Sequence, residues 1–156
     1  MSGSLIFGIV VVGFAAGLRT MTPPAVIAWA AYLGCLDLSS TPLAFMSSPL
    51  AVGILSLSAL GEYVADLLPG TPARTAAPGL IARIVTGSFA AACLLAAGGQ
   101  SLILCPIGGL AAIGGAFAGF RVRTGLVRKL GTKDAVVAIP EDLVAIGLAV
   151  AAVCLR

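Results

Sequence analysis

Five apolar stretches dominate this chain and restrict what it can fold into. They cover residues 4–18, 44–68, 80–97, 102–120 and the segment from Pro140 to the chain end. A helix needs about 20 apolar residues to cross the ~30 Å hydrocarbon core of a bilayer. We therefore predict an all-α fold, a polytopic transmembrane helical bundle of about five spans.

The scarcity of charge supports this prediction. Of the 156 residues, 60% are hydrophobic and 10% are charged, whereas a soluble domain carries roughly 25% charged residues. So few charges could not solvate the surface of a water-soluble protein. The length fits a single transmembrane domain over residues 1–156. The first apolar stretch lacks a basic leader and a cleavage site, so we expect the mature protein to retain it.

The segment after the first span is interrupted. Pro23 and Pro24 follow Arg19 closely, and two prolines must break or kink a helix there. The next apolar piece, Ala25 to Leu36, is short for a span and carries Trp29 and Tyr32, which favour the membrane interface. We expect a re-entrant or interfacial helix here. In the alternative, this piece crosses and the number of spans becomes six.

Basic residues set the expected orientation. By the positive-inside rule, the connections holding Arg74, Arg83 and the segment from Arg121 to Lys133 face the cytoplasm. With five spans the N-terminus is cytoplasmic as well, whereas with six it lies outside. The same rule accounts for the net charge of +3, so we predict no nucleic-acid partner. The expected location is the bacterial inner membrane, as a multi-pass protein.

A weak internal repeat is also visible. The residues from Gly13 to Thr22 resemble those from Gly115 to Thr124, since both are small-residue helix ends that run into an arginine. Possible repeats 4–68 and 102–156, joined by the span 80–97, would then have opposite orientations, as in inverted-repeat transporters. The alternative is a chance match, because glycine and alanine are common throughout the chain.

Ionisable residues inside the spans are the candidates for function, because each costs a few kcal/mol in hydrocarbon without a partner, water or a role. Glu62 and Asp66 stand four residues apart and share one helix face. On the five-span topology the charges predicted toward the cytoplasmic side are Glu62, Asp66, Arg83, Arg121, Glu141 and Asp142. They either form a salt-bridge network that holds the bundle together or build a polar site for a solute or ion.

Arg19 is predicted on the opposite side, next to Thr20, Thr22 and the proline break. The amides that begin the following helix could face an anion there, with Arg19 adding positive charge. The plainer interpretation is a helix end with an arginine that reaches the interface.

The remaining signals predict packing. Gly108, Gly109, Gly114, Gly115 and Gly119 form small-residue stripes that are typical of close helix contact, within or between protomers. The four cysteines are isolated in apolar surroundings and the chain has no histidine, so we expect packing thiols, with no metal and no cofactor.

The ordered motifs resemble one known family. Gly17-Leu18-Arg19 near the start, Glu62 and Asp66 followed by Pro69 in the middle, then Pro78, Gly87 and a late Glu141-Asp142 are similar to the DUF4126 family of uncharacterised bacterial integral membrane proteins. The resemblance covers most of the chain and implies a bundle of short membrane helices without an established substrate. Family members often have a basic residue after the mid-chain aspartate, whereas Leu67 follows Asp66 here.

These observations lead to a functional hypothesis. We expect a small transporter or channel for an ion or small polar solute, working as a homo-oligomer in the lipid bilayer with a charged intramembrane site. The alternative is a non-transporting scaffold, or a lipid- or partner-binding protein, whose charges are structural. We expect no enzyme activity, because the sequence has no Ser/His/Asp set, phosphate loop or metal-ligand cluster.

Overall fold

The computed structural model describes residues 2–66, 76–131 and 134–155, and within these ranges it contains helices and no strand. The α-helices are α1 (Gly3–Leu18), α2 (Thr22–Tyr32), α3 (Pro49–Ala65), α4 (Ala77–Ala97), α5 (Pro106–Leu130) and α6 (Asp134–Cys154), with 3₁₀ turns η1 (Ala44–Ser47) and η2 (Leu102–Leu104). The predicted all-α fold is confirmed.

Length and apolar character set some of these helices apart as able to cross a membrane. Among the described residues, three helical segments are long and apolar enough to cross a membrane, namely Ala77–Ala97, Leu102–Leu130 and Val136–Cys154. Two further apolar helices, Gly3–Leu18 and Pro49–Ala65, are shorter. A helical bundle with helices able to span a membrane therefore fits the prediction.

The predicted break after the first span is present. α1 ends at Leu18 and α2 begins at Thr22. Pro23 and Pro24 occupy the first turn of α2, where a missing N–H removes no intrahelical hydrogen bond. At 11 residues, α2 is about 16 Å long, roughly half the thickness of a bilayer core.

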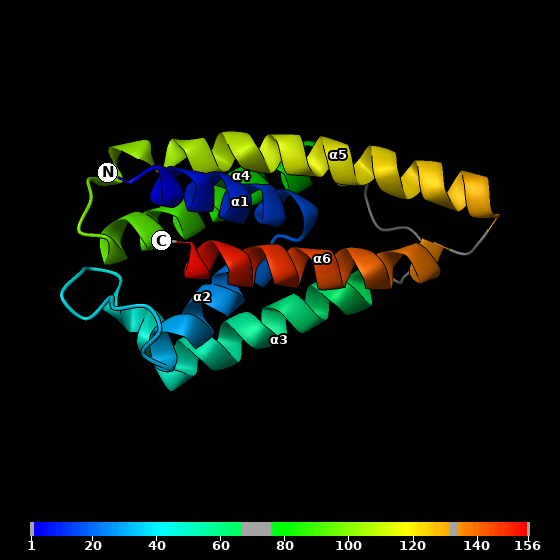
Figure 1. Cartoon of the computed structure of the whole chain (residues 1–156). Helices are drawn as coiled ribbons and strands as arrows, with labels where there is room; N and C mark the ends of the chain where they lie inside the picture. Colours follow the sequence, from blue (N-terminus) through cyan, green and yellow to red (C-terminus); the bar gives the residue numbers. More distant parts are fainter. Residues whose placement is uncertain (1, 67–75, 132–133, 156) are drawn as a thin grey trace.

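Successive helices run back and forth along the bundle, and α2 takes part in this alternation. Figure 1 shows both chain termini at one end and the C-terminal turns of α5 at the other. Ser2, Cys35, Gln100 and Cys154, which come from four chain reversals or ends, line one cavity at the end that holds the termini. The prediction that the N-terminus shares an end with the basic connection is therefore wrong. α2 runs back toward the end that holds the termini, so the directions of α1 to α6 alternate along the bundle.

Burial explains why α2 turns back into the bundle. Ile27 and Ala28 are fully buried and belong to the main hydrophobic core. A helix lying at the membrane interface would leave such side chains exposed on one face. Trp29 and Tyr32 do remain exposed, so the aromatic pair that suggested an interfacial helix marks only the outer face of α2.

Several predicted boundaries need correction. The segment from Arg121 to Ile139 was expected to be a connection, but α5 continues to Leu130 and α6 already begins at Asp134. Arginine, leucine and lysine are good helix formers, so α5 continues past its most apolar part until Gly131 ends it in the left-handed conformation, with φ of 60°. Pro140 lies inside α6 and does not begin it.

The second predicted span, residues 44–68, also starts later than expected. Residues Ala44–Ser47 form η1, and α3 begins at Pro49, where the Ser48 side chain accepts a hydrogen bond from the Ala51 amide. Its predicted end at Leu68 lies outside the described residues, as do Pro69, Arg74 and Lys133.

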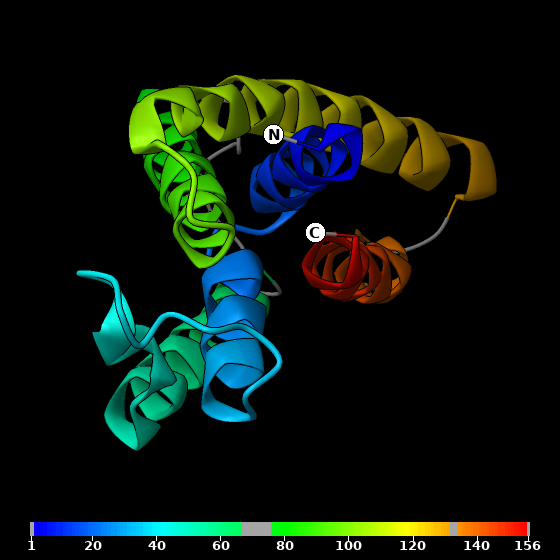
Figure 2. The same ribbon diagram turned by 60° about the vertical axis from the view of Figure 1, so that its left-hand side comes forward.

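α1 is the central helix of the bundle. It packs against α4, α5 and α6 and reaches α2 through the break (Figure 2). Glycines permit the closest approaches, because a Cβ added at Gly13 would clash with the backbone of Gly108, and one at Gly115 with the carbonyl of Phe14. The predicted close contact through the small-residue stripe is confirmed within the chain, although a Cβ at Gly114 would meet open space.

α4 and α5 form a tight helical hairpin, because only residues 98–105, which include η2, connect them. A Cβ added at Gly87 would lie 2.7 Å from the carbonyl oxygen of Gly108. α5 thus presents one glycine face to both α1 and α4.

The helix directions also bear on the proposed repeat. Gly13 faces Gly108, and Gly17 faces Ala112 and Ala116, so α1 and α5 run parallel. Inverted copies would place these two helices in opposite directions, and the predicted inversion is therefore wrong for this pair. Four reversals of direction separate α1 from α5, whereas the prediction counted three, because it left α2 out.

Candidate functional site

Seven charged side chains from five helix segments gather at the end of the bundle opposite the chain termini. This charged cluster consists of Arg19, Glu62, Asp66, Arg83, Arg123, Glu141 and Asp142. The contributing segments are the end of α1, the end of α3, the first half of α4, the second half of α5 and the first half of α6. Chain positions up to 123 residues apart meet here.

Arg19 is the most buried member of the charged cluster, with 1% of its surface exposed. Its Nη1 lies 2.6 Å from Oδ2 of Asp66, and its Nε donates to Oδ1 of Asp142 at 2.5 Å. The guanidinium carbon also lies 5.2 Å from the centre of the Tyr63 ring, in reach of a cation–π interaction. Its buried Nη2 has no hydrogen-bond acceptor among the described residues.

Asp66 links two arginines. Oδ2 of Asp66 accepts from Nη1 of Arg19 and from Nη1 of Arg123, the latter at 2.8 Å. Nη1 of Arg123 also lies 3.5 Å from Oε2 of Glu141. α3 is thereby joined to α1, α5 and α6 through one carboxylate and its neighbours. Charge-assisted hydrogen bonds of this kind are about twice as strong as neutral ones.

Glu62 binds the backbone at the start of α2. Its two carboxylate oxygens accept from the amides of Thr20 and Met21, each at 2.8 Å. These amides belong to the break between α1 and α2, at the positive end of the α2 dipole. Glu62 therefore occupies the position in which a helix N-terminus binds an anion. Nη2 of Arg83 lies 3.9 Å from the same carboxylate.

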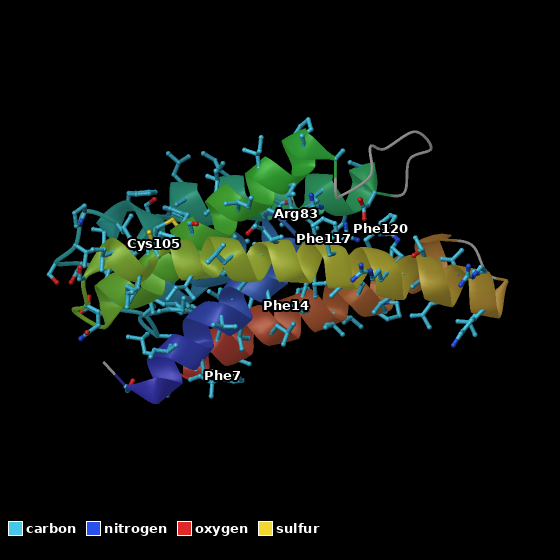
Figure 3. All side chains as sticks on the ribbon, turned by 90° about the horizontal axis from the view of Figure 1, so that it is seen from above. Phe7, Phe14, Arg83, Cys105, Phe117 and Phe120 are labelled. Atoms are coloured by element: carbon cyan, nitrogen blue, oxygen red, sulfur yellow. The ribbon has the colours of Figure 1, made fainter. Side chains whose placement is uncertain are left out.

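Arg83 fixes the opposite side of the break. Its Nε donates to the carbonyl of Gly17 at 3.1 Å, in the last turn of α1, and its Nη1 donates to Gly79 in its own helix. A cation at the C-terminal carbonyls of a helix complements the helix dipole. Figure 3 labels Arg83 on α4, close to α5.

Thr22 and Tyr63 complete the polar surroundings. Their hydroxyl oxygens lie 2.7 Å apart and share one hydrogen bond, which joins the first turn of α2 to α3. Thr20 and Thr22 are both buried. The residues around the break are thus held by α3 from one side and by α4 from the other.

The structure changes where the predicted site residues lie. Arg19, Thr20 and Thr22 were predicted on the opposite side from Glu62 and Asp66, and this is wrong, because the two groups are in direct contact. α2 returns along the bundle, so α3 brings its last turn back to the level where α1 ended. Arg83, Glu141 and Asp142 join them, and the predicted network of opposite charges is present.

Arg121 is the exception among the predicted residues. It is exposed on α5, and within the described part of the chain it contacts no carboxylate. Arg123 takes its place in the charged cluster. The helical spacing could have indicated that Arg123 is the inward residue. Arg123 stands four residues after Gly119 and so lies on the same buried face of α5. Tyr63 was also missed, although it shares a face with Asp66 at a spacing of three.

Metal-binding and disulfide sites are absent from the part of the chain that the structure describes. Over the described ranges, no group of three or more His, Cys, Asp or Glu side chains is placed to hold a metal ion. No disulfide joins any of the four cysteines, of which Cys93 is buried and Cys35 and Cys154 are exposed.

Apolar helices able to cross a membrane, with charges gathered inside the bundle, define a helical membrane protein. The chain belongs to the DUF4126 family, described as a domain of unknown function, whose model matches residues 6–155. The resemblance seen in the sequence is thus confirmed. No curated protein and no solved structure matches the chain.

Proposed function

We propose that this protein is a transporter or channel for a small anionic solute, working as a homo-oligomer in the bacterial inner membrane. The observation that carries the proposal is the position of Glu62. Its carboxylate accepts hydrogen bonds from the backbone amides of Thr20 and Met21 at a broken helix, with Arg83 beside it. A carboxylate is itself a small anion, so the same donors suit a solute that takes its place.

The surroundings of Glu62 support a site that can exchange one anion for another. Broken membrane helices whose N-termini point at anionic groups are a recurring element of transporters. Arg19 also keeps Nη2 without an acceptor among the described residues, so a buried donor remains beside the break. In the proposed cycle Glu62 leaves the amides of Thr20 and Met21, and the solute binds there.

Homo-oligomer formation rests on the outer surface. Leu50, Leu57 and Val64 of α3 are at least 60% exposed. A Cβ added at Gly53 or Gly61 of the same helix would meet open space. An apolar face with such small residues suits lipid or a closely packed second copy. By the positive-inside rule, the end with Arg128 and Lys129 faces the cytoplasm and both termini face outward.

The proposal is tested by flux from proteoliposomes loaded with chloride, formate or phosphate. We expect the wild type to release at least one of these anions faster than protein-free vesicles do. Glu62→Gln keeps the shape of the side chain but removes the negative charge that competes with the solute. It should change the rate of anion release about tenfold or more. Asp37→Asn, in the loop after α2, is the control and should leave it unchanged. No flux from any folded preparation, or equal rates for wild type and Glu62→Gln, would refute the proposal.

A second candidate is a non-transporting scaffold, or a lipid- or partner-binding protein, in which the charges only hold helices together. The observation in its favour is that all four carboxylates of the charged cluster contact a guanidinium or an amide within one chain. On this account Glu62→Gln lowers stability, and the wild type moves none of the anions.

We also propose that the protein is not an enzyme. Incubation with a lipid extract and mass spectrometry of the products tests this directly. A changed lipid species that depends on the protein would contradict it.

A further inference from the structure

An apolar groove lies between α5 and α6. Its volume is about 460 Å³. α5 contributes Val122 and Leu126, α6 contributes Val137 and Val144, and α1 contributes Phe14 and Leu18. Figure 3 shows Phe14 on α1 beside α5 and α6. The polar side chains among its lining residues are Arg123 and Glu141, which belong to the charged cluster.

The dimensions of the groove restrict its occupant. Along α5 the lining residues run from Ala118 to Leu130, a distance of about 18 Å at the helical rise. Spread over that length, the space open to the centre of a water molecule is about 5 Å wide, which makes the groove about 8 Å wide once the ~1.4 Å water radius is added on each side. A helix with its side chains is about 10–12 Å wide. A helix from a second copy would therefore not fit, but one extended hydrocarbon chain would.

Charge at the end of the groove indicates the headgroup. α5 has 25 residues, about 37 Å, so its last turn extends beyond a ~30 Å core. Lys129 stands seven residues after Val122 and three after Leu126, on the face of α5 that lines the groove, and it is exposed. Figure 1 shows the end of α5 extending past the neighbouring helices.

We propose that this groove holds one acyl chain of an anionic phospholipid whose phosphate binds Lys129. The tail contacts the apolar walls, and its methylene groups reach the level of the Arg123–Glu141 pair. The lipid thus fills the space where α5 and α6 separate, and supports the side of the charged cluster that faces the bilayer. The inference does not depend on transport, because a scaffold would bind the same lipid.

The test is native mass spectrometry of the protein released from micelles with equal amounts of phosphatidylglycerol and phosphatidylcholine. We expect one bound lipid per chain, with phosphatidylglycerol preferred about fivefold, since a basic residue near the surface contributes about that factor. Lys129→Gln should remove the preference. Arg128→Gln is the matched control: it removes the same charge from the neighbouring position, which faces away from the groove, and should keep most of the preference.

A second variant tests the groove itself. Leu126→Trp fills it from a partly exposed position and should reduce retention of both lipids at least fivefold, with an unchanged helical circular dichroism spectrum. Absence of a retained lipid in the wild type would overturn the proposal. Equal loss of preference in Lys129→Gln and Arg128→Gln would do so as well, because it would indicate attraction to the basic end as a whole.

Discussion

Arg19 and Asp142 are 123 residues apart in the chain, yet Nε of Arg19 donates to Oδ1 of Asp142 at 2.5 Å. The bond joins the end of the central helix α1 to the first half of α6. Each charge would cost a few kcal/mol if it faced hydrocarbon alone. Pairing offsets this cost, and it makes removal of a single partner more damaging than the gain from the pair would suggest.

Arg123 and Arg121 provide a matched pair of charge deletions on α5. Arg123 is buried and contacts Asp66 and Glu141, whereas Arg121 is exposed. Arg123→Gln should lower the free energy of unfolding by about 3 kcal/mol, because it removes one of the two guanidinium groups bound to Asp66 and the guanidinium beside Glu141. Arg121→Gln should change it by less than about 0.5 kcal/mol. Unfolding in mixed micelles measures both, and equal effects of the two substitutions would contradict the assignment.

Gly115 and Gly114 are adjacent and should respond oppositely to alanine. A Cβ at Gly115 would clash with the Phe14 carbonyl, while one at Gly114 meets open space. Gly115→Ala must push α1 and α5 apart and should cost about 1–3 kcal/mol. Gly114→Ala should be neutral or raise the melting temperature slightly, since alanine favours the helix by about 1 kcal/mol. A melting temperature unchanged by Gly115→Ala would show that the two helices are not in close contact.

The direction of the helices predicts which thiols react from which side of a membrane. Cys35 and Cys154 are exposed and line the cavity at the end that holds both termini, whereas Cys93 is buried. In intact cells a membrane-impermeant maleimide should modify Cys35 and Cys154 and leave Cys93 untouched.

A cysteine introduced at the basic end is the control for this experiment. In a variant whose native cysteines are replaced by serine, Arg128→Cys should react only after the membrane is opened. The reverse pattern, in which the Arg128→Cys variant is labelled in intact cells, would place the termini in the cytoplasm.

The all-helical class could be predicted from composition and apolar length alone, because both act locally along the chain. The break at Pro23 and the small-residue stripe that includes Gly108 and Gly115 were likewise local signals. The path of α2 was not, since the length of an 11-residue helix does not indicate that the chain reverses its direction there. Ile27 and Ala28 are buried because other helices pack against them, and no local pattern indicates this packing.

That one misjudged helix also determined how the candidate site was interpreted. Six of the seven residues of the charged cluster, all except Arg123, were among the residues predicted from the sequence. Their division into an outer and an inner site followed from leaving α2 out of the count of helices that reverse the chain direction. The contact between Arg19 and Asp66 depends on three successive helix directions, and no spacing within the sequence reports it.

The central claim is that the buried charges remain in this bundle because they bind one another. A double-mutant cycle between Asp66→Asn and Arg123→Gln, measured as unfolding free energies in mixed micelles, tests it most directly. The account predicts that the double variant is more stable than the sum of the single effects implies, by about 1–3 kcal/mol. Additive effects, within about 0.5 kcal/mol, would mean that the two side chains do not interact, and would contradict the account.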